Sequence, residues 1–374
     1  MDQKTTSVIA GITDFATTCV AVQPDLHQQH DFPQDLWQEM ATRDLMGIII
    51  PREYGGRGCD FATLASCATV LAEQGGNQGV VMTWMGHNLN AAYHLGNNGT
   101  EEQRQTWLPR IACGDSSLTV AISEPGAGAH PKHLKTSAIR DGDDYVLNGE
   151  KSYLTNGPLA DVFLVLAVTG EIDGRKSFSA FLVPRTTTGF SQTPGIEIDF
   201  LHPSPHCGIK LQDCRIPATN MVGAEGSAFE TISLAMRAVE DALSTASTVG
   251  AVRFLLNKVA AAASKPDLPR EGIMALGDLA GQADLLALTS QMIAQKLDRN
   301  PDDPQILMPL NAGFRTSLRS LQTGIDDLVK AYSLEPGLAY DAAHRDIMKM
   351  SGIATTAYQI RALKRGKDLL AEHS

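Results

Sequence analysis

The sequence lacks the patterns by which metal sites, nucleic-acid binders and membrane proteins are usually recognised. Its six cysteines form no Cys-x-x-Cys pair and have no histidine partner at metal-ligand spacing, so we expect reduced thiols and no metal site. Acidic residues outnumber basic ones by 42 to 31, and no basic stripe offsets the net charge of -11, which argues against nucleic-acid binding. Signal-peptide and transmembrane patterns are also missing, and we therefore expect a cytoplasmic protein without a membrane span.

A dinucleotide-binding pattern is absent as well. No Gly-x-Gly-x-x-Gly follows a strand-like run, which argues against a Rossmann domain. The 374 residues, with 43% hydrophobic and 20% charged side chains, are enough for two or three packed domains.

Three regions with different patterns follow one another along the chain. Residues 1–114 show apolar side chains at helical spacing, and Thr100 with Gln103 predicts a capped helix start. Residues 115–225 consist of short strand-like runs separated by glycine, proline and aspartate, a pattern typical of a compact β-barrel or sandwich. Residues 226–374 return to long helices, which we expect over 229–263, 272–298, 309–332 and 340–372, as a four-helix bundle.

Two turn-rich segments carry the most information. The first reads Ala-Ile-Ser-Glu-Pro-Gly-Ala-Gly over Ala121 to Gly128, and the second reads Gly-Glu-Lys-Ser-Tyr-Leu-Thr-Asn-Gly over Gly149 to Gly157. Together they resemble the flavin-binding β-domain of the acyl-CoA dehydrogenase family. Further matches occur in the same order, at residues 51–58, 99–103, 216–217 and 223–229. The resemblance implies an α+β multidomain fold with an N-terminal α-helical domain, a middle β-barrel domain and a C-terminal four-helix bundle.

The resemblance also implies FAD as the cofactor and assigns residues to it. Glycines let the backbone approach a bulky cofactor closely, and hydroxyl and N–H donors stabilise negative charge on the ring. Glu124 matches a glutamate that is structural in the family. The implied cofactor-binding residues are Val120, Ile122, Ser123, Gly128, Tyr153, Leu154, Thr155 and Thr356.

The chain departs from the family pattern at several positions. Ala129-His130 replaces the usual Ser-Asp, and the Arg-x-x-Phe-Gly and Gln-x-x-Gly-Gly segments are missing. The common catalytic glutamate near the C-terminus corresponds to Ala354, whose backbone N–H remains a candidate donor to a thioester oxygen.

Glu240 is the candidate catalytic base. It stands ten residues before Gly250 on the first long helix, where some family members place the glutamate. It lies in a narrow stripe of mostly small polar residues, which leave room for a substrate. The alternative is a solvated carboxylate paired with Arg237. The stripe consists of Ser233, Arg237, Ser244 and Ser247.

Other ionisable groups have plainer interpretations. His87 and His130 are possible acids or bases, but lone histidines are more often packing or surface residues. The basic run at Arg361, Lys364, Arg365 and Lys367 is consistent with an anionic partner or, more simply, with a solvated helix face.

The sequence as a whole favours a flavin-dependent acyl-thioester dehydrogenase that makes an α,β-unsaturated product. The resemblance implies an electron-transfer acceptor and a homotetramer or homodimer. Two alternatives remain open at this point: a flavin monooxygenase or oxidase on the same scaffold, and a degenerate non-catalytic subunit of a hetero-oligomer.

Overall fold

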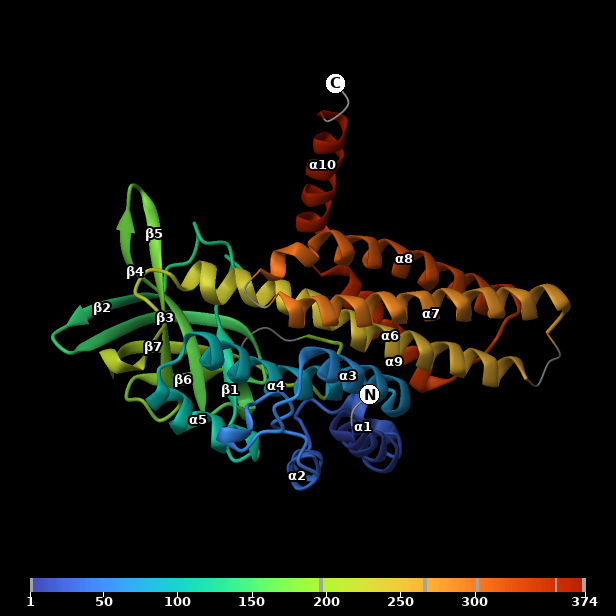
Figure 1. Ribbon diagram of the computed structural model, residues 1–374, viewed down its shortest axis with the longest axis horizontal. Coiled ribbons are helices and arrows are strands. Elements are labelled where there is room, and N and C mark those ends of the chain that lie inside the picture. The colour runs from blue at the N-terminus through green and yellow to red at the C-terminus, as the bar shows by residue number, and fades with distance from the viewer. Residues whose placement is uncertain (1–2, 195–197, 265–267, 301–302, 354, 372–374) are drawn as a thin grey trace.

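The computed structural model describes the chain except for residues 1–2, 195–197, 265–267, 301–302, 354 and 372–374 (Figure 1). Its first part is helical. The helices are α1 (Gln3–Phe15), α2 (Gln34–Thr42), α3 (Phe61–Gly75), α4 (Gln78–Asn98) and α5 (Glu101–Ala112). The Thr100 side chain accepts from the Gln103 N–H and the Gln103 side chain accepts from the Thr100 N–H, which confirms the predicted capping box.

The middle part is one mixed sheet in the order β6-β7-β3-β2-β4-β5-β8, with β1 paired in parallel to β4. Among the described residues, β6 and β8 are its unpaired ends, so the hydrogen-bond ladder does not close into the expected barrel. The strands are β1 (Leu118–Ala121), β2 (Ser137–Asp141), β3 (Asp144–Thr155), β4 (Val162–Ile172), β5 (Arg175–Pro184), β6 (Phe190–Thr193), β7 (His206–Pro217) and β8 (Met221–Val222).

The last part is again helical, with one difference from expectation. Its helices are α6 (Ala235–Ala263), α7 (Arg270–Arg299), α8 (Met308–Ala331), α9 (Leu338–Gly352) and α10 (Thr355–Ala371), and a π-helical turn, Phe229–Leu234, precedes α6. The fourth expected helix is therefore wrong as a single element. It is interrupted because Ile353 takes an extended conformation at the end of α9, and α10 then leaves the bundle (Figure 1).

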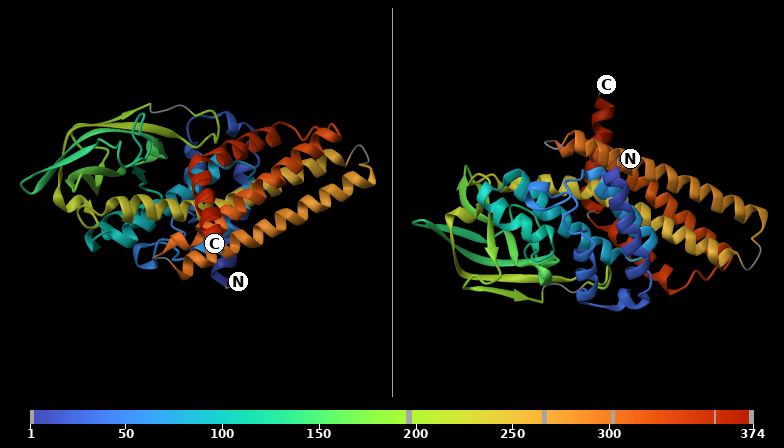
Figure 2. Two further views of the ribbon diagram at one scale, coloured as in Figure 1. Left: turned by 90° about the horizontal axis from the view of Figure 1, so that it is seen from above. Right: turned by 60° about the horizontal axis from the view of Figure 1, so that its bottom comes forward.

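Helix α6 links the parts of the molecule. It begins beside the β-sheet and runs the length of the bundle, while α3 and α4 lie along it (Figures 1 and 2). At Gly250 an added Cβ would lie 2.2 Å from the Thr69 carbonyl oxygen, so only glycine allows α6 and α3 to approach this closely. One apolar core thus joins the N-terminal helices to the first bundle helix.

The observed order of helical, sheet and helical parts confirms the expected fold class. Most of the apolar side chains that set the helical spacing in the sequence are buried in these cores. Among the described residues, no helix is long and apolar enough to cross a membrane, and no group of histidine, cysteine or acidic side chains is arranged to hold a metal ion. None of the six cysteines forms a disulfide.

Candidate functional site

The structure brings the two informative sequence segments together at the ends of β1 and β3. The Lys151 ammonium donates to the carbonyl oxygen of Ile122 at 3.0 Å, and the Ser152 N–H donates to the carbonyl of Ser123 at 2.9 Å. Val120 lies on β1 itself, and the Thr119 hydroxyl bonds to the carbonyl of Thr155 at the end of β3. Six of the predicted cofactor residues, Val120, Ile122, Ser123, Tyr153, Leu154 and Thr155, therefore lie in the same part of the fold, at the ends of β1 and β3.

The Glu124 carboxylate connects the two segments of this region. Its carboxylate lies 2.9 Å from the Lys151 ammonium and accepts hydrogen bonds from the backbone N–H groups of Lys135 and Thr136, at 2.7 and 2.9 Å. Burial alone would raise the pKa of Glu124, but Lys151 and Thr136 outweigh it and lower that pKa. A buried, fully bonded carboxylate of this kind has the structural role expected for Glu124.

Tyr153 occupies an irregular position in β3. The register between β3 and β7 shifts between Lys151 and Leu154, which marks a β-bulge, and Tyr153 has a φ of 60°. Because bulky residues rarely adopt this conformation, the surrounding structure must hold it in place. At the bulge Tyr153 is 49% exposed, whereas the next residue, Leu154, is buried in the sheet core.

The glycines of the first segment line open space. Gly126 and Gly128 have φ values of 71° and 55°, and an added Cβ at either position would meet no atom within 4 Å. The turn that contains them is closed by hydrogen bonds between Glu124 and Gly128. Its backbone is therefore accessible to a large ligand from outside.

These features fit the isoalloxazine end of a flavin. A flat ring needs an aromatic or apolar surface to lie on and polar groups at its edge, and Tyr153 with the Thr155 and Ser123 segments offers both. The buried hydroxyl oxygen of Ser152 has no hydrogen-bond partner in the described structure. This oxygen is shielded from the surface, so the surface that a ligand would meet is formed by Tyr153 and the turn glycines.

His206 is a neighbour of the candidate site that sequence reasoning missed. It begins β7 directly opposite Thr155, and its Nε2 lies 3.0 Å from the Thr155 hydroxyl oxygen. Its Nδ1 lies 3.0 Å from the carbonyl oxygen of Ser204. A lone histidine 51 residues away from Thr155 carries no local signal, so only the strand pairing reveals the contact.

Glu240 lies near the start of α6, shortly after the π-helical turn. Its side chain is exposed, yet burial and the adjacent Asp241 raise its pKa to about 7, while Arg237 acts in the opposite direction. The exposed carboxylate keeps part of its water shell, and the protein around the rest of the side chain favours the protonated form. Among the described residues no ion pair within 4 Å joins Glu240 to Arg237, although the Arg237 charge lowers the pKa of Glu240 and the carboxylate is exposed, as the solvated alternative expects.

The remaining predicted residues lie elsewhere or outside the description. Thr356 is in α10, which stands on the bundle away from β1 and β3, and its side chain is outside the described residues, as is all of Ala354 (Figure 1). His87 is fully buried, bonds to Ile111 and Ser117, and has its pKa lowered to about 4 by burial, which makes it a packing residue. His130 lies in the turn region, with its ring 4.9 Å from that of His133.

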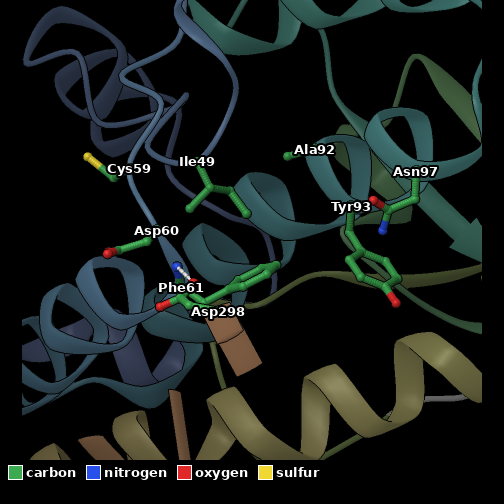
Figure 3. Close-up of a pocket in the computed structure, with 8 residues that line it drawn as sticks. All are labelled: Ile49, Cys59, Asp60, Phe61, Ala92, Tyr93, Asn97 and Asp298. Atoms are coloured by element: carbon green, nitrogen blue, oxygen red, sulfur yellow. Dashed lines mark hydrogen bonds between the residues drawn. The ribbon is translucent and has the colours of Figure 1, made fainter. Parts of the chain in front are cut away.

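A cavity of about 200 Å³ lies between α3, α4 and the end of α7, and none of the predicted residues lines it (Figure 3). Its two carboxylates are already engaged. Asp60 accepts from the Thr63 N–H, and Asp298 accepts from the N–H groups of Phe61 and Ala62 at the start of α3. Both acidic groups of the cavity thus cap the start of α3. We interpret the cavity as a packing gap between helices.

Comparison with known proteins places the chain in a family. Residues 3–115 match the model of the acyl-CoA dehydrogenase N-terminal domain, and residues 119–214 match that of the acyl-CoA dehydrogenase middle domain. A mitochondrial isovaleryl-CoA dehydrogenase of Solanum tuberosum is 32% identical over 58% of this chain and 52% of its own length. A probable acyl-CoA dehydrogenase of Bacillus subtilis is 34% identical over 59% of this chain and 58% of its own. The matched part thus spans little more than half the length of these relatives.

Solved structures extend the likeness of fold over nearly the whole chain. Butyryl-CoA dehydrogenase from Megasphaera elsdenii superposes with a TM-score of 0.85 and 22% identity, covering 99% of both chains. A glutaryl-CoA dehydrogenase from Mycobacterium smegmatis, solved in complex with FADH2, has a TM-score of 0.83 and 21% identity, covering 99% of this chain and 95% of its own. The motifs, the fold and the two matched domain models together show that this chain belongs to the acyl-CoA dehydrogenase family.

Proposed function

We propose that this protein is an FAD-dependent acyl-thioester dehydrogenase that introduces a double bond between the α and β carbons of its substrate. The observation that carries the proposal is the contact between the ends of β1 and β3, where Tyr153 is exposed on a β-bulge and the Glu124–Lys151 ion pair is buried. FAD bound there would accept the hydride that leaves the β-carbon.

Glu240 is the residue we assign to removal of the α-proton. A carboxylate with a pKa of about 7 is a stronger base than one in water, and it still loses its own proton near neutral pH. The base is also exposed, so a thioester can reach it. Removal of the proton leaves an electron pair on the α-carbon, which forms the new double bond as the hydride departs.

The small residues near Glu240 suit an acyl chain. The Ser247 hydroxyl donates to the carbonyl of Ser244 at 3.0 Å, and the Ser244 hydroxyl donates to that of Asp241 at 3.1 Å. Both hydroxyl hydrogens are thus already bonded to backbone carbonyls of the helix. An apolar acyl chain could therefore lie against these serines without leaving a hydroxyl donor unpaired.

The proposal extends to the assembly, the electron acceptor and the compartment. Helix α7, on the outer side of the bundle, exposes Leu285, Leu288 and Met292 at helical spacing, by 66%, 66% and 52% (Figure 2). An apolar stripe of this kind could be buried against the same stripe of a second copy of the chain. We therefore propose that the protein is a homotetramer or a homodimer. We also propose that a separate electron-transfer protein reoxidises the cofactor and that the protein is cytoplasmic.

Two measurements test the function. The purified protein should show the visible absorption of bound FAD, and an acyl-CoA thioester should bleach that absorption without oxygen. A coloured protein that no acyl thioester bleaches would contradict the proposed reaction. For the assembly, Leu285→Glu combined with Leu288→Glu should reduce the mass measured by light scattering to that of one chain.

A further inference from the structure

The Thr155–His206 contact has a defined direction. Strands β3 and β7 are antiparallel with Thr155 opposite His206, so the two side chains share one face of the sheet. The His206 Nδ1 atom lies 3.0 Å from the Ser204 carbonyl oxygen, and a carbonyl oxygen can only accept. The hydrogen of this bond therefore belongs to Nδ1.

The state of the ring follows from its surroundings. Burial lowers the pKa of His206, the bond to Ser204 opposes that change, and the nearby His202 lowers the pKa further. At neutral pH the ring is therefore neutral, and its one hydrogen is already on Nδ1. Nε2, 3.0 Å from the Thr155 oxygen, has only a lone pair, so the Thr155 hydroxyl must be the donor in this bond.

The consequence concerns what Thr155 can offer a ligand. A hydroxyl has one hydrogen and two lone pairs, and His206 takes the hydrogen. We propose that His206 is a positioning residue that makes the Thr155 hydroxyl an acceptor towards the flavin and so favours the reduced form of that cofactor. This inference rests on the proposed function, and it reverses the expectation that Thr155 donates to the ring.

General flavin chemistry links this acceptor to the redox state. The N5 atom of an oxidised isoalloxazine ring carries no hydrogen and accepts hydrogen bonds, whereas the reduced ring carries an N–H there and donates. Where the Thr155 hydroxyl faces N5, an oxygen that can only accept matches the N–H of the reduced ring and opposes the lone pair of the oxidised one. A Thr155 hydroxyl free to rotate would serve both forms.

The first test examines the histidine alone and does not depend on FAD. Nitrogen NMR of the full chain with ¹⁵N-labelled histidine, with the His206 signals assigned by their loss in His206→Gln, should show a neutral ring with hydrogen on Nδ1 at pH 7. Hydrogen on Nε2, or on both nitrogens, would overturn the inference.

The second test measures the midpoint potential of the bound FAD. His206→Phe frees the Thr155 hydroxyl, so the ratio of reduced to oxidised cofactor should fall roughly tenfold at a given applied potential, a decrease of about 30 mV for a two-electron couple. His206→Gln should keep the wild-type potential, because its amide oxygen can accept from Thr155. If His206→Phe does not fold, His206→Asn, which is too short to reach Thr155, replaces it.

The double variant separates this role from a general effect on packing. In a Thr155→Val background, His206→Phe should cause no further change in potential, because the hydroxyl that His206 orients is gone. Bound FAD with an unchanged potential in His206→Phe would overturn the role of His206 alone. A chain that binds no FAD would instead overturn the proposed function, and with it this role.

Discussion

The ammonium group of Lys151 lies 2.9 Å from a carboxylate oxygen of Glu124, and both side chains are buried. The pKa shifts of the two partners disagree about whether burial or the ion pair has the larger effect. Burial lowers the pKa of Lys151 to about 8, whereas the ion pair and the N–H donors lower the pKa of Glu124. Because backbone N–H groups also stabilise the carboxylate, we take both groups as charged at pH 7. Together with the bonds to the carbonyls of Ile122 and Ser123, this pair joins the loop after β1 to β3.

Replacing Lys151 by methionine should destabilise the protein strongly. The substitution leaves the Glu124 carboxylate buried without its cation, and such losses cost about 3–5 kcal/mol in the free energy of unfolding. Lys210→Met is the matched control, because Lys210 pairs with Glu150 at 3.8 Å on the exposed face of the same sheet and should cost less than about 1 kcal/mol. Urea unfolding of the two variants checks the difference, and equal losses would count against the structural role of the pair.

Glu240→Gln should abolish substrate-dependent bleaching while FAD stays bound. In the wild type, the base acts only when ionised, and its pKa is about 7, so kcat/KM should rise with pH up to about 7 and level off above it. Glu230→Gln is the control, since Glu230 is exposed on the preceding turn and should leave the pH profile unchanged. Activity retained in Glu240→Gln would remove this residue from the mechanism.

Tyr153→Ala should weaken FAD binding. If the exposed ring supports the flavin, its loss removes one aromatic contact, worth roughly a threefold to tenfold change in the dissociation constant. Tyr153→Phe keeps the ring and should bind FAD as the wild type does. Fluorescence titration of the protein freed of FAD measures both constants, and equal affinities for all three proteins would show that the ring does not contact the cofactor.

Gly250→Ala should destabilise the contact between α6 and α3. The added methyl would lie 2.2 Å from the Thr69 carbonyl oxygen and 2.7 Å from the Ala72 side chain, so the helices must separate, at a cost of about 1–3 kcal/mol. Gly313→Ala, on α8 with no atom within 4 Å of the added methyl, should be stabilising by up to about 1 kcal/mol. Thermal unfolding midpoints should therefore move in opposite directions for the two variants.

Local sequence patterns were enough to predict the order of the parts and the position of the main segments. The Thr100–Gln103 capping box depends on residues three apart, and the Gly126 and Gly128 turn depends on the chemistry of the turn itself. Glu240 could be singled out because the family resemblance implies a glutamate ten residues before a helix glycine, which is Gly250 in this chain. Such features need no knowledge of which distant segments meet.

What the sequence by itself determined is therefore the family, the three-part fold and the segments that form the candidate site. The tertiary structure decided the bulge that exposes Tyr153, the end of α9 at Ile353 and the pairing of Thr155 with His206. It also decided the raised pKa of Glu240. The physical reason is that strand register, the replacement of water around a charge and the direction of a hydroxyl bond depend on groups far apart in the chain, which local periodicity does not report.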